Sequence, residues 1–128
     1  MPHISTLERF IARVEQNLHA EALEEFYAPE ATLRENPTGV QNSRTACIAK
    51  EHVVRARAKV MTSECVRPAL LQGDHVAIRW IFRFEWLDGS VTRIEEVAMQ
   101  RWEGERIAEE TFFYDPAQRT PVAGTEHE

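Results

Sequence analysis

The segment from Asp74 to Trp86, DHVAIRWIFRFEW, alternates between two kinds of side chain along its thirteen residues. Such a period of two is typical of a β-strand, whose side chains point in turn to opposite faces of a sheet. At about 3.3 Å per residue the strand would be roughly 43 Å long, which favours a bent sheet. One face would carry only apolar side chains, namely Val76, Ile78, Trp80, Phe82, Phe84 and Trp86. Four aromatic rings on one face need a cover, so we expect helices to pack on it.

Three helices are expected in the first half of the chain. An apolar spacing of three and four residues predicts a helix from Thr6 to Asn17. The pattern repeats from His19 to Tyr27 and ends before Pro29. A third helix is predicted from Arg44 to about Met61, with its charged side chains, Lys50 among them, on a solvated face.

One strand is expected before the third helix, and the others are expected after it. A short strand from Ala31 to Asn36 precedes the third helix. Strands from Glu64 to Gln72, Val91 to Glu103 and Arg106 to Asp115 then join the opening segment through tight turns. The sequence therefore predicts an α+β domain in which three N-terminal helices pack on a strongly curved antiparallel sheet, forming a cone-shaped barrel with an internal pocket.

Length and charge limit the classes of protein to consider. The 128 residues suit a single domain, with a core over about residues 6–115 and a flexible tail over residues 116–128. The net charge of -6 and the lack of a lysine-rich run argue against nucleic acid or a membrane surface as a partner. No signal peptide or membrane-spanning segment is evident, so we expect a cytoplasmic protein.

The sequence offers no motif for a cofactor. Cys47 and Cys65 are too far apart for a typical metal pair, and we interpret them as small apolar residues. There is no metal-ligand spacing, phosphate-binding glycine loop or nucleophile elbow. Of the histidines, His52 is expected near the cavity mouth and His75 at an exposed strand start, while His19 is expected in a loop.

Two strings resemble the nuclear transport factor 2-like superfamily, to which the SnoaL-like polyketide cyclases and the ketosteroid isomerases belong. LEEFYAPEAT, residues 23–32, resembles the passage in which the second helix of these proteins enters the first strand. RWEGERIAEE, residues 101–110, resembles their final hairpin. The resemblance covers about residues 6–115 and implies the fold more than an activity, because this fold hosts isomerases, cyclases, dehydratases, hydrolases and non-catalytic proteins.

The resemblance also implies a catalytic carboxylate. Glu35 stands where the ketosteroid isomerases keep the base that moves a proton next to a carbonyl group, and an aromatic pocket would raise its pKa. Phe10 and Ala98 stand where these enzymes keep two donors that stabilise the oxyanion, which argues against steroid isomerisation by that mechanism. In the alternative interpretation, Glu35 is a rim carboxylate bonded to Asn36 or Arg34.

The resemblance further implies which side chains face the pocket. On the strand from Val91 these are Ile94, Glu96, Ala98, Gln100 and Trp102. On the last strand they are Glu110, Phe112 and Tyr114, or Glu109, Thr111 and Phe113 if a bulge near Gly104 shifts the register. The candidate substrate-binding residues are Phe10, Trp80, Phe82, Phe84, Ala98, Gln100, Trp102 and Phe112.

These residues predict a cofactor-free enzyme that transfers a proton on a small hydrophobic carbonyl or polycyclic substrate, as an isomerase or a cyclase does. Glu35 would be the base, and Tyr114 or Glu110 the acid. Glu96 and Glu110 could instead pair with arginines on the outer face of the sheet. The alternative function is a non-catalytic protein of the same fold that binds a hydrophobic ligand or supports a partner.

The outer face of the sheet is expected to be charged. Its residues would be Arg79, Arg83, Glu85, Arg93, Glu95 and Arg101, whose alternating charges could pair across a two-fold axis in a homodimer. An epoxide hydrolase, with a carboxylate, an arginine and a second carboxylate, would need Arg79 or Arg101 to face inward. The strand alternation argues against that.

Overall fold

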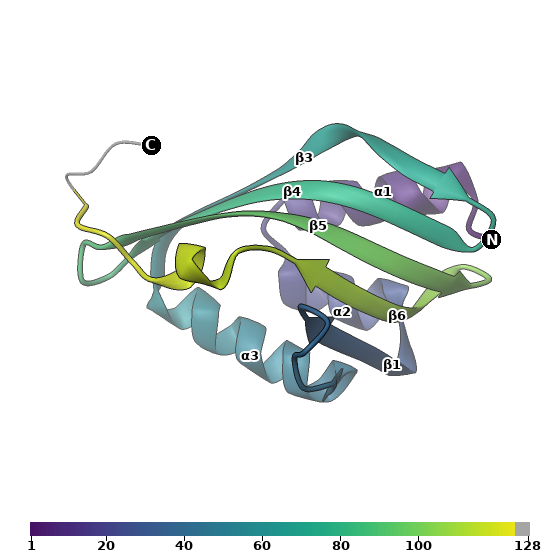
Figure 1. The fold of residues 1–128 in the computed structure, drawn as a ribbon, viewed down its shortest axis with the longest axis horizontal. Helices are drawn as coiled ribbons and strands as arrows, with labels where there is room; N and C mark the ends of the chain where they lie inside the picture. The colour runs from purple at the N-terminus through teal and green to yellow at the C-terminus, as the bar shows by residue number, and fades with distance from the viewer. Residues whose placement is uncertain (125–128) are drawn as a thin grey trace.

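The computed structural model describes residues 1–124 of the chain. Three helices and a six-stranded sheet make up the fold, and the strand order is β2-β1-β6-β5-β4-β3. The helices lie on one face of the sheet (Figure 1). In chain order the elements are α1 (Ile4–Glu15), α2 (His19–Phe26), β1 (Tyr27–Glu35), β2 (Asn42–Ser43), α3 (Arg44–Arg57), β3 (Ala58–Gln72), β4 (His75–Trp86), β5 (Val91–Glu103), β6 (Arg106–Phe113) and the 3-10 turn η1 (Pro116–Arg119).

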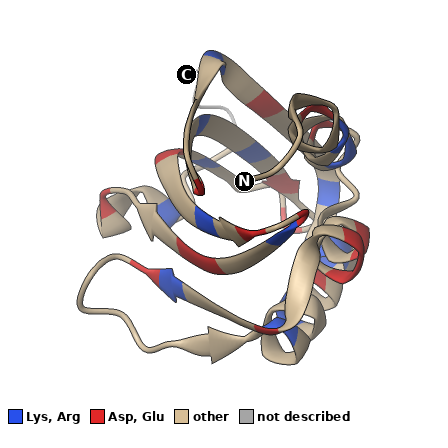
Figure 2. Cartoon of the chain, turned by 90° about the vertical axis from the view of Figure 1, so that its right-hand side faces the viewer, with Lys and Arg blue, Asp and Glu red and all other residues tan. Residues whose placement is uncertain are grey.

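The α+β class is confirmed, but the predicted shape of the sheet is wrong in two respects. The sheet is mixed, because β1 pairs with β6 in parallel while the other pairs are antiparallel. It is also open and not strongly curled, since β2 and β3 form two separate edges (Figure 2). The strongly curved, cone-shaped barrel is therefore replaced by an open sheet with helices across one face.

The third helix is shorter and the strand after it longer than predicted. The Ser43 hydroxyl accepts a hydrogen bond from the Ala46 amide at 3.1 Å, which caps the start of α3. The helix ends at Arg57, because residues 58–63 pair with the end of β4 as part of β3. No residue of α3 is fully buried, so the helix covers the sheet with only half-buried side chains such as Ile48.

The apolar face predicted for β4 is observed, but the burial of its side chains decreases along the strand. Val76, Ile78 and Trp80 are buried, whereas the side chains from Phe82 onward are only half-buried. Phe10 of α1 covers the buried half and meets Trp102 edge to face at 6.2 Å between ring centroids. The half-buried part of the strand is where the structure leaves a cavity.

The segment after β6, predicted to be part of a flexible tail, contacts β5 through Gln118 and Val122. The Asp115 side chain accepts a hydrogen bond from the Ala117 amide at 3.0 Å and caps η1. The Gln118 side-chain oxygen accepts from the Glu95 amide at 2.6 Å, and Val122 forms a β-bridge with Val91. Residues of the segment as far as Val122 therefore contact the sheet, while the flexibility of the tail stays a prediction and residues 125–128 lie outside the described part.

The outer face of the sheet carries the expected charges, and they pair within the chain. Arg79 forms an ion pair with Glu95, and Arg101 with Glu109 at 2.7 Å. In Figure 2, segments coloured for Lys and Arg and for Asp and Glu occur on several strands of the sheet. A homodimer through this face stays a prediction. Within residues 1–124 no helix is both long and apolar enough to cross a membrane.

Candidate functional site

A cavity of about 240 Å³ lies between the sheet and the helices α2 and α3. Its sheet wall is aromatic, since β4 contributes two stacked pairs of rings. Trp80 stacks on Phe82 with the centroids 5.5 Å apart, and Phe84 stacks on Trp86 at 5.1 Å. Ligand sites are usually apolar cavities with a few polar groups, so this wall suits a small, flat hydrophobic molecule.

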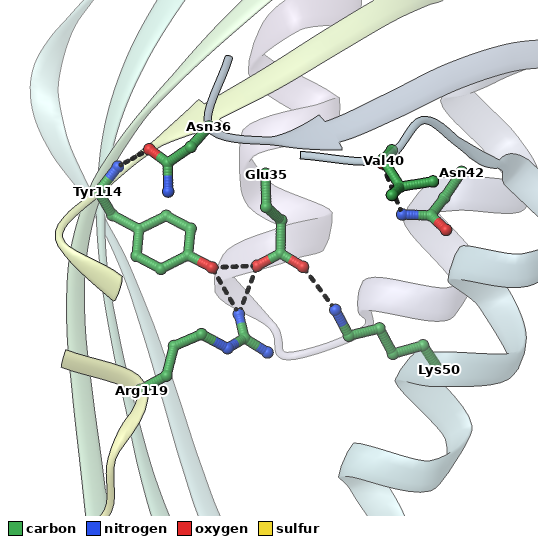
Figure 3. Close-up of polar contacts among 7 residues, drawn as sticks. All are labelled: Glu35, Asn36, Val40, Asn42, Lys50, Tyr114 and Arg119. Carbon is green, nitrogen blue, oxygen red and sulfur yellow. Dashed lines mark hydrogen bonds and ion pairs between the residues drawn. The ribbon is translucent and has the colours of Figure 1, made fainter. Parts of the chain in front are cut away.

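Four polar residues meet at the open end of the cavity, and we call them the mouth cluster: Glu35, Lys50, Tyr114 and Arg119 (Figure 3). One oxygen of Glu35 accepts hydrogen bonds from the Tyr114 hydroxyl and from Arg119. The other accepts from the Lys50 ammonium group at 2.7 Å. Arg119 also donates to the Tyr114 hydroxyl at 3.1 Å. The residues come from four separate parts of the chain, β1, α3, the end of β6 and η1.

The pKa of Glu35 is lowered, contrary to the sequence-based expectation. Partial burial alone would raise it, but the hydrogen bonds from Lys50 and Tyr114 and the charges of Lys50 and Arg119 outweigh that effect. Neither of the alternative partners contacts the carboxylate, because Arg34 donates to the Pro37 carbonyl and Asn36 accepts from the Tyr114 amide. Glu35 is therefore ionised at neutral pH and held by two cations.

Glu110 is buried at the wall of the cavity, with only 3% of its surface exposed. The Tyr27 hydroxyl donates to one of its oxygens, and the Gln100 amide donates to the other at 2.6 Å. Gln100 in turn accepts from the Trp102 indole at 2.9 Å. Burial raises the pKa of Glu110 to about 7, although these hydrogen bonds oppose the change. Each oxygen of Glu110 therefore accepts one hydrogen bond from within the protein.

Glu96 lines the same cavity and pairs with Trp80 across β4 and β5. Its carboxyl group forms no hydrogen bond or ion pair with any of residues 1–124, since Arg79 and Arg93 pair with Glu95 and Arg101 pairs with Glu109. Burial and the negative charges of Glu110 and Glu35 raise its pKa to about 8. At pH 7 Glu96 is therefore a neutral carboxylic acid with a free O–H group facing the cavity.

Carboxyl NMR titration should separate these three groups. We expect Glu35 to titrate below its usual value of 4.5, Glu110 near 7 and Glu96 near 8. Each signal can be assigned by its absence in the matching Glu→Gln variant. A Glu96 signal that titrates near 4.5 would contradict the neutral carboxylic acid on which the chemistry below depends.

The remaining predicted site residues divide between the cavity and the core. The even register of β6 is the one observed, because Glu110 pairs with Gln100 and Phe112 with Ala98, despite an irregularity beside Trp102. His52 is exposed and does not line the cavity, so the expectation for that residue is wrong. The predicted residues that line the cavity are Phe10, Trp80, Phe82, Phe84 and Phe112. Those buried behind it are Ala98, Gln100 and Trp102.

Sequence reasoning missed several polar groups of the cavity. Lys50 was assigned to a solvated face and Arg119 to a tail, yet both contact Glu35. His19 begins α2, as the helical pattern predicted, but its ring was not expected at the cavity and lies 5.2 Å from that of Phe82. Its two nitrogens face Ser63 at 2.9 Å and Glu51 at 3.5 Å. Nowhere in residues 1–124 do three His, Cys, Asp or Glu side chains gather as metal ligands would.

No protein-family model matches the chain, and no curated protein matches its sequence. Solved structures do match. A hypothetical protein with a ketosteroid isomerase-like fold from Catenulispora acidiphila, in complex with trimethylamine, is similar over 91% of this chain and 89% of its own, with 16% identity and a TM-score of 0.73. A nuclear transport factor 2-like protein of unknown function from Burkholderia pseudomallei covers 90% and 92%, with 14% identity and a TM-score of 0.73.

A proposed SnoaL-like polyketide cyclase from Mesorhizobium loti is similar over 86% of this chain and 97% of its own, with 22% identity and a TM-score of 0.68. At such identities the similarity shows the fold alone. The chain therefore has the nuclear transport factor 2-like fold, as the two sequence strings predict.

Proposed function

From this fold and its cavity we propose that the protein is a cofactor-free enzyme that moves a proton on a small hydrophobic carbonyl compound, in the manner of an isomerase or a cyclase. The observation that carries the proposal is a pair of carboxyl groups whose pKa values are displaced in opposite directions within one cavity. Glu35 is ionised and can accept a proton, whereas Glu96 is neutral and can donate one. Opposite pKa shifts of this kind assign Glu35 as the base and Glu96 as the acid.

The reaction would begin at the carbon next to the carbonyl group. Glu35 takes a proton from this carbon, and the electron pair of the broken C–H bond forms a C=C bond as charge moves to the carbonyl oxygen. Glu96 donates its O–H hydrogen bond to that oxygen and stabilises the charge. Return of the proton from Glu35 to another carbon completes an isomerisation. In a cyclisation the enolate carbon attacks a second carbonyl group, the C=O π bond breaks, and the oxygen of that group takes the proton from Glu35.

Glu96 would supply the oxyanion donor that is missing at positions 10 and 98. Phe10 and Ala98 cannot donate a hydrogen bond, but Glu96 lies two residues before Ala98 on the same face of β5. Glu35 pairs with Phe112, Phe112 pairs with Ala98, and Glu96 lies two residues along β5 from Ala98, so two strand spacings across and two residues along place the Cα atoms of the two glutamates roughly 12 Å apart. That separation leaves room for a substrate between their side chains.

Tyr114 and Glu110, the two acids first considered, have other roles in this proposal. The Tyr114 hydroxyl donates to Glu35, and its pKa is raised by burial and by that carboxylate, so it stays protonated and positions the base. Glu110 uses both oxygens as acceptors for Tyr27 and Gln100 and shapes the cavity wall. A non-catalytic hydrophobic pocket would need none of this polar lining, which favours the enzyme.

One observation favours a second reaction, the addition of water to an epoxide. The sequence suggested Arg79 or Arg101 for the arginine of such a site, and both pair on the outer face of the sheet. Arg119 lines the cavity instead and contacts Glu35. Glu35 would take a proton from a water molecule while the oxygen of that water attacks an epoxide carbon. Glu96 would give a proton to the epoxide oxygen as the C–O bond breaks.

Deuterium exchange tests the first reaction without knowledge of the natural substrate. The protein is incubated in D₂O with hydrophobic cyclic ketones such as 2-tetralone, and deuterium at the carbon next to the carbonyl group is followed by mass spectrometry. We expect the wild type to accelerate exchange and Glu35→Gln to lower the rate by about 10²-fold or more, because general-base catalysis contributes about 10²–10⁴-fold.

Glu109→Gln is the matched control, because Glu109 pairs with Arg101 on the outer face, and it should exchange at the wild-type rate. Exchange no faster than in buffer, or an undiminished rate in Glu35→Gln, would contradict proton transfer by Glu35. If indene oxide is opened with incorporation of oxygen from H₂¹⁸O while no ketone exchanges, the second reaction is the better description.

A further inference from the structure

Two cations, Lys50 and Arg119, share the single carboxylate of Glu35 at the cavity mouth. We propose that they also bind a carboxylate of the substrate, so that the natural substrate is a hydrophobic keto acid and not a neutral ketone. This inference rests on the proposed function, because it names the substrate class of the same cavity.

Both cations have hydrogen-bond donors to spare. Arg119 uses only Nη1, which donates to Glu35 and to the Tyr114 hydroxyl. A guanidinium group has five N–H donors, and its Nε and Nη2 have no partner among residues 1–124. Lys50 makes one hydrogen bond, to Glu35 at 2.7 Å, and has two further donors. Figure 3 shows both cationic groups on the same side of the Glu35 carboxylate, so one bound carboxylate could reach both.

The local charge balance also favours an anion. The mouth cluster contains two cations and one carboxylate, and Arg34 adds a third cation to the cavity lining. Of the other carboxyl groups in the lining, Glu96 is mostly neutral at pH 7 because its pKa is about 8, whereas Glu51 and Glu110, which has a pKa of about 7, lie outside the mouth cluster, so the positive excess is that of the mouth cluster. The positive excess stands out in a chain with a net charge of -6. A substrate carboxylate would neutralise it.

The rest of the cavity indicates what the anion is attached to. Beyond the mouth the sheet wall consists of the stacked rings of β4, which suit a flat hydrophobic body. A molecule anchored by its carboxylate at Arg119 would lie along this wall with its carbonyl group within reach of Glu96. The two cations would then also stabilise the second negative charge that develops during proton removal.

Binding of two compounds of nearly equal shape tests this inference. We would titrate the protein with 2-naphthoate and with 2-naphthamide at pH 7 and low salt, by calorimetry. Because Lys50 and Arg119 are 50% and 44% exposed, salt and water weaken their attraction for an anion. We therefore expect a moderate preference, with 2-naphthoate bound about 10-fold more tightly than the amide, and less so at high salt.

We expect substitutions of the cations and of Glu35 to change 2-naphthoate binding in opposite directions. Arg119→Gln and Lys50→Gln should each reduce the preference for 2-naphthoate several-fold, while Glu35→Gln should strengthen 2-naphthoate binding because it frees both cations. Arg79→Gln, on the outer face, is the matched control and should leave the preference unchanged. Unchanged binding of the neutral amide in every variant will show that the cavity is intact.

Equal affinity for the two compounds in the wild type, no binding of 2-naphthoate, or a preference that survives both Arg119→Gln and Lys50→Gln would overturn the inference. These measurements involve no turnover, so a negative result would contradict the anion site without contradicting the proposed proton transfer. A protein that exchanges neutral ketones but shows no preference for the anion keeps the proton-transfer proposal and loses only the anion site.

Discussion

The free energy of unfolding is expected to fall by several kcal/mol as the pH rises from about 5 to about 8. The cause is the pair of cavity carboxyl groups, Glu96 and Glu110, whose pKa values in the folded protein are about 8 and about 7 against a usual value of 4.5. Their contribution to stability is fully present below pH 4.5 and is lost as the pH rises through the folded-state pKa. At about 1.36 kcal/mol per pKa unit, Glu110 alone accounts for roughly 3 kcal/mol.

Urea unfolding between pH 5 and pH 8.5 measures this slope. Glu96→Gln and Glu110→Gln should each flatten it and should be more stable than the wild type at pH 8, because a neutral amide replaces a carboxylate that is costly to ionise. Glutamine at position 110 keeps an acceptor for Gln100 and can donate to the Tyr27 hydroxyl.

Glu35→Gln is the control for the slope. The pKa of Glu35 is lowered, so its contribution is present above pH 4.5 and is lost only as the pH falls through its folded-state pKa. The slope between pH 5 and pH 8 should therefore persist in this variant. A flat wild-type profile, or a slope that survives in the Glu96→Gln/Glu110→Gln double variant, would show that the two carboxyl groups are not held neutral by the fold.

The alternation of β4 was readable from the sequence because strand faces depend only on local geometry. Val76, Ile78 and Trp80 are buried on the predicted face, and Phe82 and Phe84 share it. The pattern could not show that the second half of the strand borders a cavity. That depends on how far α3 approaches the sheet, which is a matter of packing between distant elements.

Pairing over long sequence distances explains the errors in the fold. Residues 58–61 look like the end of a helix, but their partners in β4 lie more than twenty residues away and draw them into β3. The same holds for the segment after β6, where Gln118 bonds to the Glu95 amide. Propensity along the chain contains no information about such partners, and tertiary pairing overrides it.

The sequence indicated which residues form the candidate site but not the protonation states of its carboxyl groups. The resemblance implied both Glu35 and an inward Glu96. Whether a carboxyl group gains or loses its proton depends on the cations that reach it, and those of Glu35 come from 15 and 84 residues away. Glu96 forms no ion pair within residues 1–124, since Arg79 and Arg93 pair with Glu95, and the charge of Arg119 lowers its pKa less than burial and the charges of Glu110 and Glu35 raise it. The two carboxyl groups therefore acquire opposite roles for reasons that no local pattern contains.

Replacing Glu96 with leucine is expected to lower the rate of the proposed ketone exchange by about 10²–10³-fold. This is the usual effect of removing one donor that stabilises a developing oxyanion. The variant should fold, since leucine suits an aromatic cavity and removes the carboxyl group that destabilises the protein at high pH. Retention of more than half of the wild-type rate would contradict the role of Glu96 as the donor.

The pH profile of exchange distinguishes an acid from a merely structural residue. The wild-type rate should fall as the pH rises through about 8, where Glu96 loses its proton, and should fall on the acid side only below pH 4.5, where Glu35 gains one. Glu96→Gln keeps a hydrogen-bond donor that does not titrate, so its rate should lie between those of the wild type and Glu96→Leu, without the decline near pH 8. If that decline persists in Glu96→Gln, another group provides the proton, and Glu96 only shapes the cavity.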